Sequence, residues 1–515
     1  MMAAPSKTYN AAADLLERNL AAHRAAKIAY VDERGRYTYA ELAERVSRCA
    51  NALLDSGLER GQRLALCLLD TIDFPTCFLG AVKAGIIPIP LSTLSTAADF
   101  AAILKDSRPH AAIVSSDIKP VFDHAAALAQ WNGRTYISEG DFSNNTLHAK
   151  MVASADAPTA ETTPDDVCFW LYSSGSTGKP KGVIHRHDSL LQTAELYGQG
   201  VLGIKEQDVI FSAPKLFFAY GLGNALTFPL SVGATTILFS GRLTPAVVSA
   251  ILREHRPTIF FGVPTLFNAL LASGELPKKG EHALRFCVSA GEALPEKVGL
   301  AWRERTGIDI VDGIGSTEML HIFVSNRPGE VRYGTTGRIV PCYRVRLVDE
   351  SDNTVSPGEL GELQVSGPSA AVGYWENPDA TRATFVDNCV RTGDKFKQTP
   401  QGDFVHCGRT DDMLKVGGIY VSPLEVEEAL LAHEAILEAA VIGAPDEMGL
   451  VKPKAFLVLR QGIEVNQELI NAIQQFVKGR LAPYKYPRWI EVVSALPKTA
   501  TGKIRRYALR QGGSK

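Results

Sequence analysis

The sequence has no signature of a disulfide framework or a zinc site, and little net charge. Its eight cysteines are scattered, and no two form a Cys-x-x-Cys pair, so a reducing compartment is expected. The formal net charge is only -2, which excludes a global electrostatic attraction to nucleic acid or to an anionic membrane. Small-molecule partners are therefore expected, with no nucleic-acid partner and no membrane partner, and the oligomeric state stays open.

Long uninterrupted apolar segments are also missing. Polar and charged residues between Asn10 and Arg18 leave no room for the apolar core of a secretory signal, so the cytoplasm is the expected location. One uncharged run, Leu216 to Gly241, is long enough to cross a bilayer, but glycine, asparagine and proline interrupt it. A buried strand, loop and helix is the interpretation we prefer for this run.

Length and periodicity predict an α/β protein of more than one domain. A chain of 515 residues with 45% hydrophobic side chains exceeds one ordinary core. Thr38 and Glu41 predict a capping box that starts a helix, and strand, helix and strand patterns follow over Arg63 to Leu69, Phe74 to Lys83 and Ile86 to Pro90. The expected fold is a large N-terminal domain, made of two α/β layers and a β-rich module near Tyr343 to Val365, with a small mobile α+β C-terminal domain.

A domain boundary is predicted near Gly408 to Asp412, which divides the chain into residues 1–410 and 411–515. A complete small α/β unit follows this point. It contains a second predicted capping box at Ser422 to Glu425, and an amphipathic helix is predicted around Leu469 to Leu481.

The segment Ser173 to Lys181 has the residue types of a phosphate-binding loop. It follows an apolar run, Val167 to Leu171, and contains glycines, hydroxyl side chains and two lysines. Proline follows Lys179, so the segment does not match the GxxxxGK[ST] loop. By itself, the segment is equally compatible with a flexible Gly/Ser turn. A second glycine pattern, Gly198 to Gly203, matches GxGxxG but follows a helical segment, so we interpret it as a helix end and turn.

Several motifs in fixed order reveal a family resemblance. The motifs are Ser173–Lys181, Asp312–Glu318, Arg391–Asp394, Gly408–Lys415 and Pro497–Lys503. With these motifs in this order, the chain resembles the adenylate-forming acyl-CoA synthetase superfamily, and the stretches Lys215–Gly221 and Glu318–His321 are most similar to those of bacterial benzoate-CoA ligases.

The resemblance implies two half-reactions with ATP, Mg2+ and coenzyme A. A carboxylate attacks the α-phosphorus of ATP and expels pyrophosphate, and the thiol of coenzyme A then attacks the acyl-adenylate and expels AMP. Because two anions meet in the first step, cations are needed near the transferred group. The implied catalytic residues are Lys503, Thr317 and Glu318, with Glu318 also the metal ligand.

The resemblance also assigns nucleotide-binding residues. They are Ser173, Ser174, Gly175, Ser176, Thr177, Gly178, Lys179, Lys181, Ser289, Ala290, Gly291, Glu292, Asp312, Gly313, Asp394 and Arg409. Gly291 permits a close approach to the adenine ring, and Asp394 accepts hydrogen bonds from the ribose hydroxyls. Alternative interpretations remain open: Glu318 as a surface acid beside a turn, Asp394 and Arg409 as ordinary loop charges, and the segment around Lys503 as a solvated basic tail or nucleic-acid patch.

The acyl pocket and the thiol-binding loop are implied in the same way. The pocket is expected to consist of Phe218, Ala219, Tyr220, Gly221, Pro264, Gly313, Ile314, Gly315 and His321. Aromatic walls and glycines suit a flat ring, and the lack of an acid between Phe218 and Tyr220 disfavours an amino-acid substrate. His321 is a pocket wall, a hydrogen-bond partner of a ring substituent or a core histidine. Asp411 is the implied hinge, and the implied coenzyme A loop comprises Lys415, Gly417, Gly418, Ile419 and Tyr420.

Three functions share these motifs. The first is an aryl-CoA ligase acting on benzoate or a substituted benzoate. The second is an adenylating enzyme that loads an aryl acid onto a carrier protein. The third, a catalytically dead nucleotide-binding regulator, is disfavoured because Glu318 and Lys503 are both present. Lys503 is also a candidate target of a lysine acetyltransferase, because acetylation removes the charge that it uses.

Overall fold

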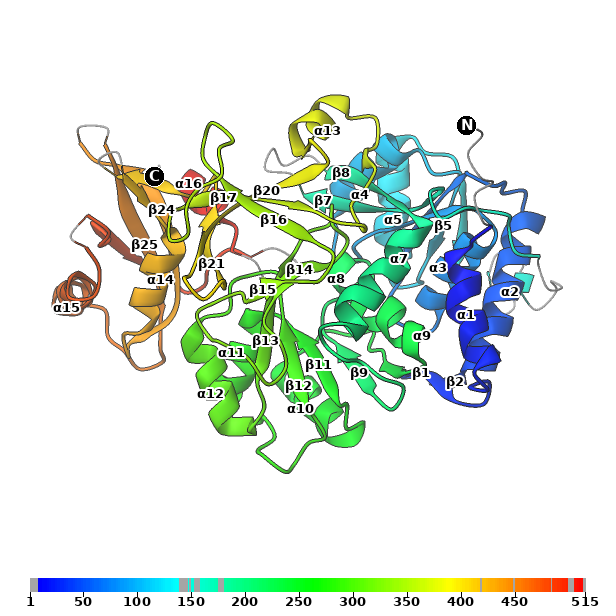
Figure 1. Cartoon of the computed structure of the whole chain (residues 1–515), viewed down its shortest axis with the longest axis horizontal. Coiled ribbons are helices and arrows are strands. Elements are labelled where there is room, and N and C mark those ends of the chain that lie inside the picture. The colour runs from blue at the N-terminus through cyan, green and yellow to red at the C-terminus, as the bar shows by residue number, and fades with distance from the viewer. Residues whose placement is uncertain are drawn as a thin grey trace.

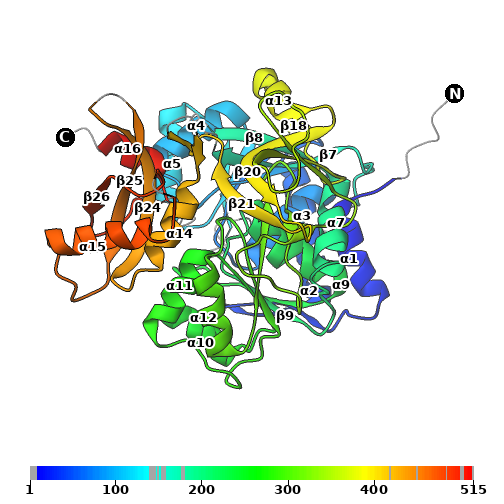
Figure 2. The ribbon, with the colours of Figure 1, turned by 60° about the vertical axis from the view of Figure 1, so that its left-hand side comes forward.

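A computed structural model shows a large α/β body with a smaller unit at one end (Figure 1). The structure describes residues 8–138, 147, 150–151, 158–174, 180–416, 419–447, 450–482, 484–498 and 504–512. The C-terminal unit lies against the body beside α12 (Glu296–Thr306) and β21 (Phe404–Arg409). The Nζ of Lys297 in α12 donates to the carbonyl of Leu431 at 3.5 Å. Figure 2, in which the molecule is turned by 60°, also shows the C-terminal unit (orange and red) beside the body.

The largest sheet is mainly parallel, with antiparallel strands at both edges. Its strands, in spatial order, are β15 (Arg338–Ile339), β14 (Ile322–Ser325), β13 (Ile310–Gly315), β12 (Phe286–Ser289), β11 (Ile259–Gly262), β9 (Val209–Ser212), β10 (Thr235–Ile237), β1 (Ile28–Asp32) and β2 (Gly35–Thr38). The central strands β9, β11 and β12 are almost entirely buried, as expected for parallel strands covered on both faces.

Helices cover the two faces of this sheet. One face packs with α10 (Pro245–Glu254), α11 (Pro264–Ser273) and α12 (Glu296–Thr306) into a core that includes Phe260 and Trp302. The other face packs with the π-helix η1 (Ala194–Gln199) and the helix α9 (Phe228–Val232). Helix α7 (His187–Thr193) runs into η1, and α8 (Ala219–Leu222) runs through the π-helix η2 (Gly223–Thr227) into α9.

A second, parallel sheet forms the other α/β layer. It consists of β4 (Ile87–Pro90), β3 (Arg63–Cys67), β5 (Ala111–Val114) and β6 (Arg134–Ile137). Helices α1 (Ala11–Ala21), α2 (Tyr39–Asp55) and α3 (Asp73–Lys83) pack in one core beside it, and α4 (Ala97–Ser107) and α5 (Lys119–Ala129) pack in another. The predicted capping box of Thr38 and Glu41 is present at the start of α2.

Two antiparallel sheets make up the β-rich part of the body. The first is β18 (Gly373–Tyr374), β8 (Pro180–Arg186) and β7 (Val167–Ser174). The second comprises β16 (Arg344–Val348), β17 (Gly361–Ser366), β20 (Cys389–Gln398) and β19 (Phe385–Val386), with β21 (Phe404–Arg409) paired to β20. Helix α13 (Pro378–Thr384) connects them, and its first turn is capped by Asn377.

The C-terminal unit has its own core. It contains the hairpin β22 (Leu414–Val416) and β23 (Ile419–Val421), the sheet β24 (Ile436–Pro445), β25 (Val451–Leu459) and β26 (Trp489–Val492), and the helices α14 (Pro423–Leu431), α15 (Gln467–Lys478) and α16 (Arg506–Gly512). Val426, Ile473 and Val477 of the two predicted helices pack in this core. At Ser422 only half of the predicted capping box forms, because the Glu425 carboxylate pairs with Lys485.

The long uncharged run is an internal packing segment. Most of Leu216 to Gly241 is helical, through α8, η2 and α9, and strand β10 follows, so the run contains helix, loop and strand as expected, with the helices first. No helix in the described part of the chain is long and apolar enough to cross a membrane. The GxGxxG pattern at Gly198 to Gly203 lies at the end of η1 and in the following turn, as predicted.

Candidate active site

The two ends of the predicted phosphate loop lie on paired strands. Strands β7 and β8 pair Ser173 with Lys181 and Ser174 with Pro180. Residues 175–179, which include Gly175, Ser176, Thr177, Gly178 and Lys179, lie outside the described residues. The Nζ of Lys181 lies 5.0 Å from the centroid of the Tyr374 ring, so the lysine packs against an aromatic face near the start of β8.

The turn after β13 carries Thr317 and Glu318, and buried residues hold its backbone. The carbonyl of Thr317 accepts a hydrogen bond from the Nε2 of His185 at 2.9 Å. His185 is fully buried and stacks on Phe169. Burial lowers the pKa of His185 to about 3, so the imidazole is neutral at physiological pH. A hydrogen bond from His185 therefore connects strand β8, which follows the predicted phosphate loop, to the Thr317 turn.

The Glu318 carboxylate has one oxygen engaged by a neighbouring tyrosine. The hydroxyl of Tyr374 donates to its Oε1 at 2.9 Å. A carboxylate has lone pairs on both oxygens, so Glu318 retains acceptor capacity for a metal. A single carboxylate fits Mg2+, which keeps several waters and binds substrate phosphates rather than a full protein cage. No cluster of three or more His, Cys, Asp or Glu side chains suited to a metal occurs among the residues the structure describes.

The predicted adenine segment follows β12. Ser289 ends this strand and is paired in register with Asp312 of β13. Gly291 has φ of +94°, a backbone conformation that disfavours side chains with a Cβ. Burial raises the pKa of Asp312 well above its usual range. Its Oδ1 and the Oγ of Ser289 are buried beside the Ala290–Glu292 turn, without a hydrogen-bond partner in the described part of the chain.

Asp394 and Arg409 face each other across adjacent strands. They are register partners on β20 and β21, and the Nη1 of Arg409 lies 3.4 Å from the Oδ2 of Asp394. His406 approaches the other carboxylate oxygen at 3.3 Å. The Arg409 side chain is exposed, whereas that of Asp394 is only 13% exposed. The strand pairing therefore brings two predicted nucleotide residues together.

The predicted acyl pocket centres on His321. This histidine is 3% exposed, and burial lowers its pKa to about 3. Its Nε2 lies 3.3 Å from the carbonyl of Tyr220 and 3.1 Å from the Oδ1 of Asn224. Its ring contacts those of Tyr197, Tyr220 and Phe228. His321 is thus neutral and enclosed by aromatic rings.

The remaining pocket residues come from three segments of the body. Phe218 precedes α8, Ala219 and Tyr220 begin it, and the hydroxyl of Tyr220 donates to the carbonyl of Val288 at 3.2 Å. Pro264 is the buried first residue of α11. Gly313, Ile314 and Gly315 end β13.

The glycines of the predicted pocket allow close backbone packing. A Cβ on Gly221 would lie 2.0 Å from the carbonyl oxygen of Lys215, and one on Gly315 would lie 2.5 Å from that of His321. Real Cβ atoms do not approach backbone atoms so closely. These two glycines therefore allow the chain segments around the pocket to meet.

The predicted thiol-binding loop and hinge lie where the body joins the C-terminal unit. Lys415 pairs with Tyr420 across the hairpin that also includes Ile419, and Gly417 and Gly418 at its tip lie outside the described residues. Asp411 is exposed and precedes this hairpin. Lys503 also lies outside the described residues. Lys498 and Ile504, which flank its segment, form an antiparallel bridge.

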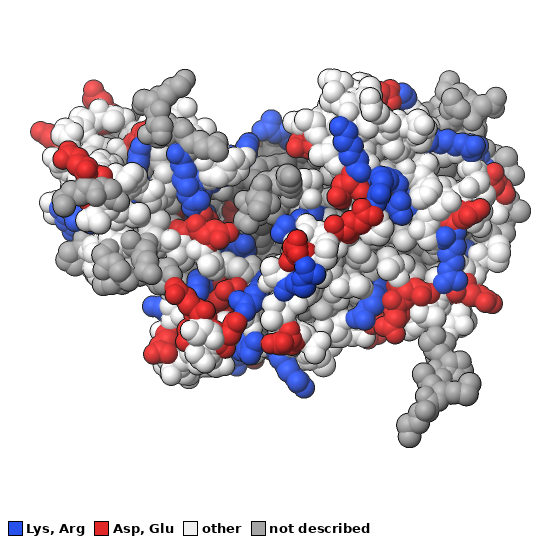
Figure 3. Space-filling model, turned by 90° about the horizontal axis from the view of Figure 1, so that it is seen from above, with Lys and Arg blue, Asp and Glu red and all other residues white. Residues whose placement is uncertain are grey.

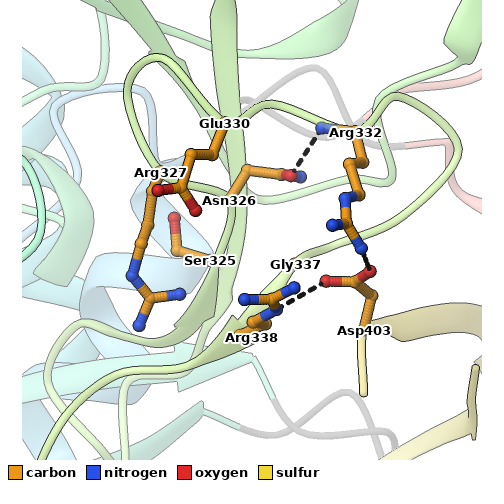
Figure 4. Close-up of a pocket in the computed structure, with 8 residues that line it drawn as sticks. All are labelled: Ser325, Asn326, Arg327, Glu330, Arg332, Gly337, Arg338 and Asp403. Carbon is orange, nitrogen blue, oxygen red and sulfur yellow. Dashed lines mark hydrogen bonds and ion pairs between the residues drawn. The ribbon is translucent and has the colours of Figure 1, made fainter. Parts of the chain in front are cut away.

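A small surface pocket (Figure 4) borders the predicted site only at Ser325 and Asn326, which bond to the carbonyl of Asp312. Ser325, Asn326, Arg327, Glu330, Arg332, Gly337, Arg338 and Asp403 line it. Asp403 is 5% exposed and pairs with both Arg332 and Arg338, the latter at 3.1 Å. These ion pairs join the β14–β15 edge to the strand β21, which indicates a structural role.

Charged side chains are mixed over the surface around the two units. On the face seen in Figure 3, Lys and Arg side chains are interspersed with Asp and Glu side chains, and a notch separates the C-terminal unit from the body. On this face, positively charged side chains therefore lie next to negatively charged ones.

Several residues of the site were not singled out from the sequence. Among them, His185, Asn224 and Tyr374 each contact a predicted site residue that is far away in the sequence. Asn224 offered one signal, since it is a polar residue within the uncharged run. Its contact with His321, 97 residues away, depends on tertiary structure.

Comparison with known proteins identifies two family regions in the chain. Residues 16–375 match the family model described as AMP-binding enzyme. Residues 425–503 match the model described as AMP-binding enzyme C-terminal domain. The two matches lie on the body and on the C-terminal unit, respectively.

Individual relatives match over nearly the whole chain. A benzoate-CoA ligase of Thauera aromatica is 55% identical over 504 residues, which cover 98% of this chain and 96% of the relative. The crystal structure of a benzoate CoA ligase from Burkholderia xenovorans LB400 has a TM-score of 0.92 and 49% identity, with 98% of this chain and 100% of that one covered. An anthranilate CoA ligase crystallised with anthranoyl-AMP has a TM-score of 0.93 and 40% identity, covering 98% and 97%. These structures confirm the predicted α/β fold with a large N-terminal and a small C-terminal domain.

Proposed function

Because this chain belongs to the AMP-binding enzyme family, we propose that it is an ATP-dependent aryl-CoA ligase. It converts benzoate or a substituted benzoate to the coenzyme A thioester through an acyl-adenylate, with ATP and coenzyme A as co-substrates. The observation that carries this proposal is the 55% identity to a benzoate-CoA ligase over 98% of the chain. Aromatic rings surround His321, and burial keeps its imidazole neutral, which supports the proposal independently.

In the proposed first half-reaction, a carboxylate oxygen of the aromatic acid bonds to the α-phosphorus as the bond to pyrophosphate breaks. The segment from Ser173 to Lys181 holds the departing pyrophosphate, and Thr317 donates to the α-phosphate. Lys503 bridges the attacking carboxylate and the α-phosphate with a mobile positive charge. Glu318 would hold Mg2+, which supplies neutralisation of phosphate charge when bound.

The nucleotide is held from two sides. Ser289, Ala290, Gly291, Glu292 and Gly313 would pack on the adenine face. Asp312 would accept a hydrogen bond from the exocyclic amino group, since its Oδ1 is buried without a partner among the described residues. Asp394 would bind the ribose hydroxyls, with Arg409 beside it supplying positive charge near the phosphates.

The pocket chemistry favours a flat, uncharged ring. Aromatic side chains surround His321, and burial keeps that histidine neutral. The carbonyl of Tyr220 is purely an acceptor, so the Nε2 of His321 carries the proton. The Nδ1 is then an acceptor, buried without a partner in the described structure. It could accept a hydrogen bond from a hydroxyl or amino group on the ring, so substituted benzoates are included in the proposed substrate class.

The second half-reaction requires a different arrangement of the C-terminal unit. We propose that residues 1–410 and 411–515 move as separate domains about Asp411. Rotation removes Lys503 and brings the hairpin of Lys415, Gly417, Gly418, Ile419 and Tyr420 beside the thiol. The sulfur then attacks the acyl carbon, and the bond to AMP breaks. Acetylation of Lys503 by a lysine acetyltransferase would silence only the first half-reaction.

The test measures both products separately. Benzoate-dependent pyrophosphate release and coenzyme A-dependent AMP formation are expected from the purified protein, across a panel of benzoate, hydroxybenzoates and aminobenzoates. A phosphopantetheinylated carrier protein offered in place of coenzyme A separates a carrier-loading enzyme from a ligase. Pyrophosphate release that proceeds to thioester only with the carrier would overturn the ligase assignment.

A further inference from the structure

Tyr374 joins three elements of the phosphate-binding region. It ends the short strand β18, which pairs with β8 next to the predicted phosphate loop. Its side chain is largely buried, and its hydroxyl donates to the Oε1 of Glu318 at 2.9 Å. The ordinary pKa of a tyrosine is about 10, so the phenol is protonated and can donate this hydrogen bond at neutral pH.

The same chain segment also holds the backbone of the Glu318 turn. The amide of Ala371 donates to the carbonyl of Glu318 at 2.8 Å. The hydroxyl of Ser369 donates to the carbonyl of Met319 at 2.7 Å. Glu318 is thus held at its carboxylate by Tyr374 and at its backbone by the preceding residues. A glutamate whose carboxylate and backbone are both restrained loses less side-chain entropy when its carboxylate binds a metal.

The Tyr374 ring itself is held in place. Its edge packs against Phe385, with ring centroids 5.5 Å apart, and its amide donates to the Oγ1 of Thr381 at 3.0 Å. The ammonium of Lys181 lies over its face. One ring therefore has the ammonium of Lys181 over its face and the carboxylate of Glu318 at its hydroxyl.

We propose that Tyr374 is a positioning residue that aligns the Glu318 carboxylate to receive the divalent metal of the metal–ATP complex. The inference rests on the proposed function, because it takes Glu318 to be the metal ligand. Tyr374 takes no part in bond making or breaking. Its hydroxyl selects one orientation of the carboxylate, so its loss weakens metal–ATP binding and adenylation and leaves thioester formation from a finished adenylate unchanged.

The decisive variant is Tyr374→Phe, which removes one oxygen and retains the ring beneath Lys181. We expect the Mg2+ concentration for half-maximal pyrophosphate release, at fixed ATP, to rise about tenfold, as is typical when a partner that orients a metal ligand is lost. Binding of Mn2+–ATP, followed by electron paramagnetic resonance without any acid substrate, should weaken to a similar extent. Coenzyme A-dependent release of AMP from supplied benzoyl-adenylate should match that of the wild type.

Tyr39→Phe is the matched control. Tyr39 is also buried, and its hydroxyl donates to the carbonyl of Ala234 at 2.7 Å, so this variant loses one buried hydrogen bond of the body without touching Glu318 or the residues that hold it. The proposal predicts unchanged Mn2+–ATP affinity in this control.

Two outcomes would overturn the proposal: unaltered Mn2+–ATP affinity in folded Tyr374→Phe protein, or equal weakening in both variants. The metal-binding measurement needs no acid substrate, so it still decides the role of Tyr374 if no aromatic acid is activated. Absence of turnover in the wild-type protein would count against the proposed function alone.

Discussion

The side chains of His321 and Asn224 meet at 3.1 Å in the interior of the body, between the imidazole Nε2 and the amide Oδ1. Asn224 belongs to the π-helix η2, and the neighbouring Gly223 lies directly against the histidine ring. Because position 223 has no side chain, the imidazole of His321 can lie against the backbone there. The orientation of His321, and with it the shape of the predicted acyl pocket, therefore depends on a glycine that contacts no substrate in our proposal.

Gly223→Ala is expected to displace His321. A Cβ at this position would lie 2.3 Å from the imidazole Cδ2 and 3.1 Å from the Cζ of Phe228, and overpacking of this kind costs about 1–3 kcal/mol. If the strain falls on the acyl pocket, kcat/KM for benzoate falls at least about tenfold, with little change in the KM for ATP. Steady-state kinetics at varied benzoate and varied ATP would measure this difference.

The control for this substitution is Gly479→Ala. Gly479 caps α15 with φ of -73°, and a Cβ there would meet only ordinary contacts at 3.6 Å. This variant should keep wild-type kinetics. A Gly223→Ala enzyme with unchanged kcat/KM for benzoate would contradict the assignment of His321 to the pocket.

A second prediction concerns stability in acid and the buried His187. Its Nδ1 accepts the amide of Ala11 at 3.2 Å, and burial lowers its pKa from 6.5 to about 4. The unfolded chain binds this proton below pH 6.5 or so, whereas the folded chain does so only near pH 4. Stability from the neutral imidazole is therefore fully present above the unfolded pKa and is lost as the pH falls toward the folded pKa.

His187→Asn retains a side-chain acceptor and removes the titration. Between about pH 7 and pH 4, the free energy of unfolding of the wild type should fall by about 3 kcal/mol more than that of the variant. Urea denaturation at a series of pH values provides the measurement. Parallel pH dependence of the two proteins would show that His187 does not titrate as its burial implies.

Local patterns were sufficient for much of the fold. The capping box of Thr38 and Glu41 involves residues three apart, and it forms as predicted. At Ser422 the same pattern was only half right, because Glu425 pairs instead with Lys485, 60 residues later. The capping pattern is local, but the competing partner comes from tertiary structure.

The candidate site shows the same division between local and long-range information. The order of motifs predicted which segments belong to the site, and the register of β20 and β21 brings Asp394 and Arg409 together. The contacts that orient the side chains were not predictable: Tyr374 reaches Glu318 across 56 residues. The extent of helix within Leu216 to Gly241 was not predictable for a related reason, since a buried apolar run has no polar face that distinguishes helix from strand.

A third prediction concerns an ion pair that anchors the chain after the Lys503 segment. Arg506 contacts both carboxylate oxygens of Glu427 at 2.8 Å, and Glu427 is 6% exposed. Arg506→Met would leave this carboxylate buried without its cation, which typically costs about 3–5 kcal/mol. Chemical denaturation should detect this loss in the transition of the C-terminal unit.

Arg510→Ala is the control for Arg506. Arg510 pairs with Asp412 at the surface, where its side chain is 38% exposed, and such pairs contribute at most about 1 kcal/mol. If Arg506→Met is no more destabilised than Arg510→Ala, the buried pair is not the anchor of α16.

The last prediction separates the two half-reactions at Lys503. Lys503→Ala removes the charge proposed to bridge the carboxylate and the α-phosphate, so benzoate-dependent pyrophosphate release should fall by at least about a thousandfold. Formation of benzoyl-CoA from supplied benzoyl-adenylate should be preserved, because the thiol attacks after Lys503 has left the site. Lys478→Ala is the matched control, since Lys478 ends α15 and packs over the Tyr486 ring. Equal loss of both half-reactions in Lys503→Ala would mean that one arrangement of the C-terminal unit serves both, contrary to the rotation proposed about Asp411.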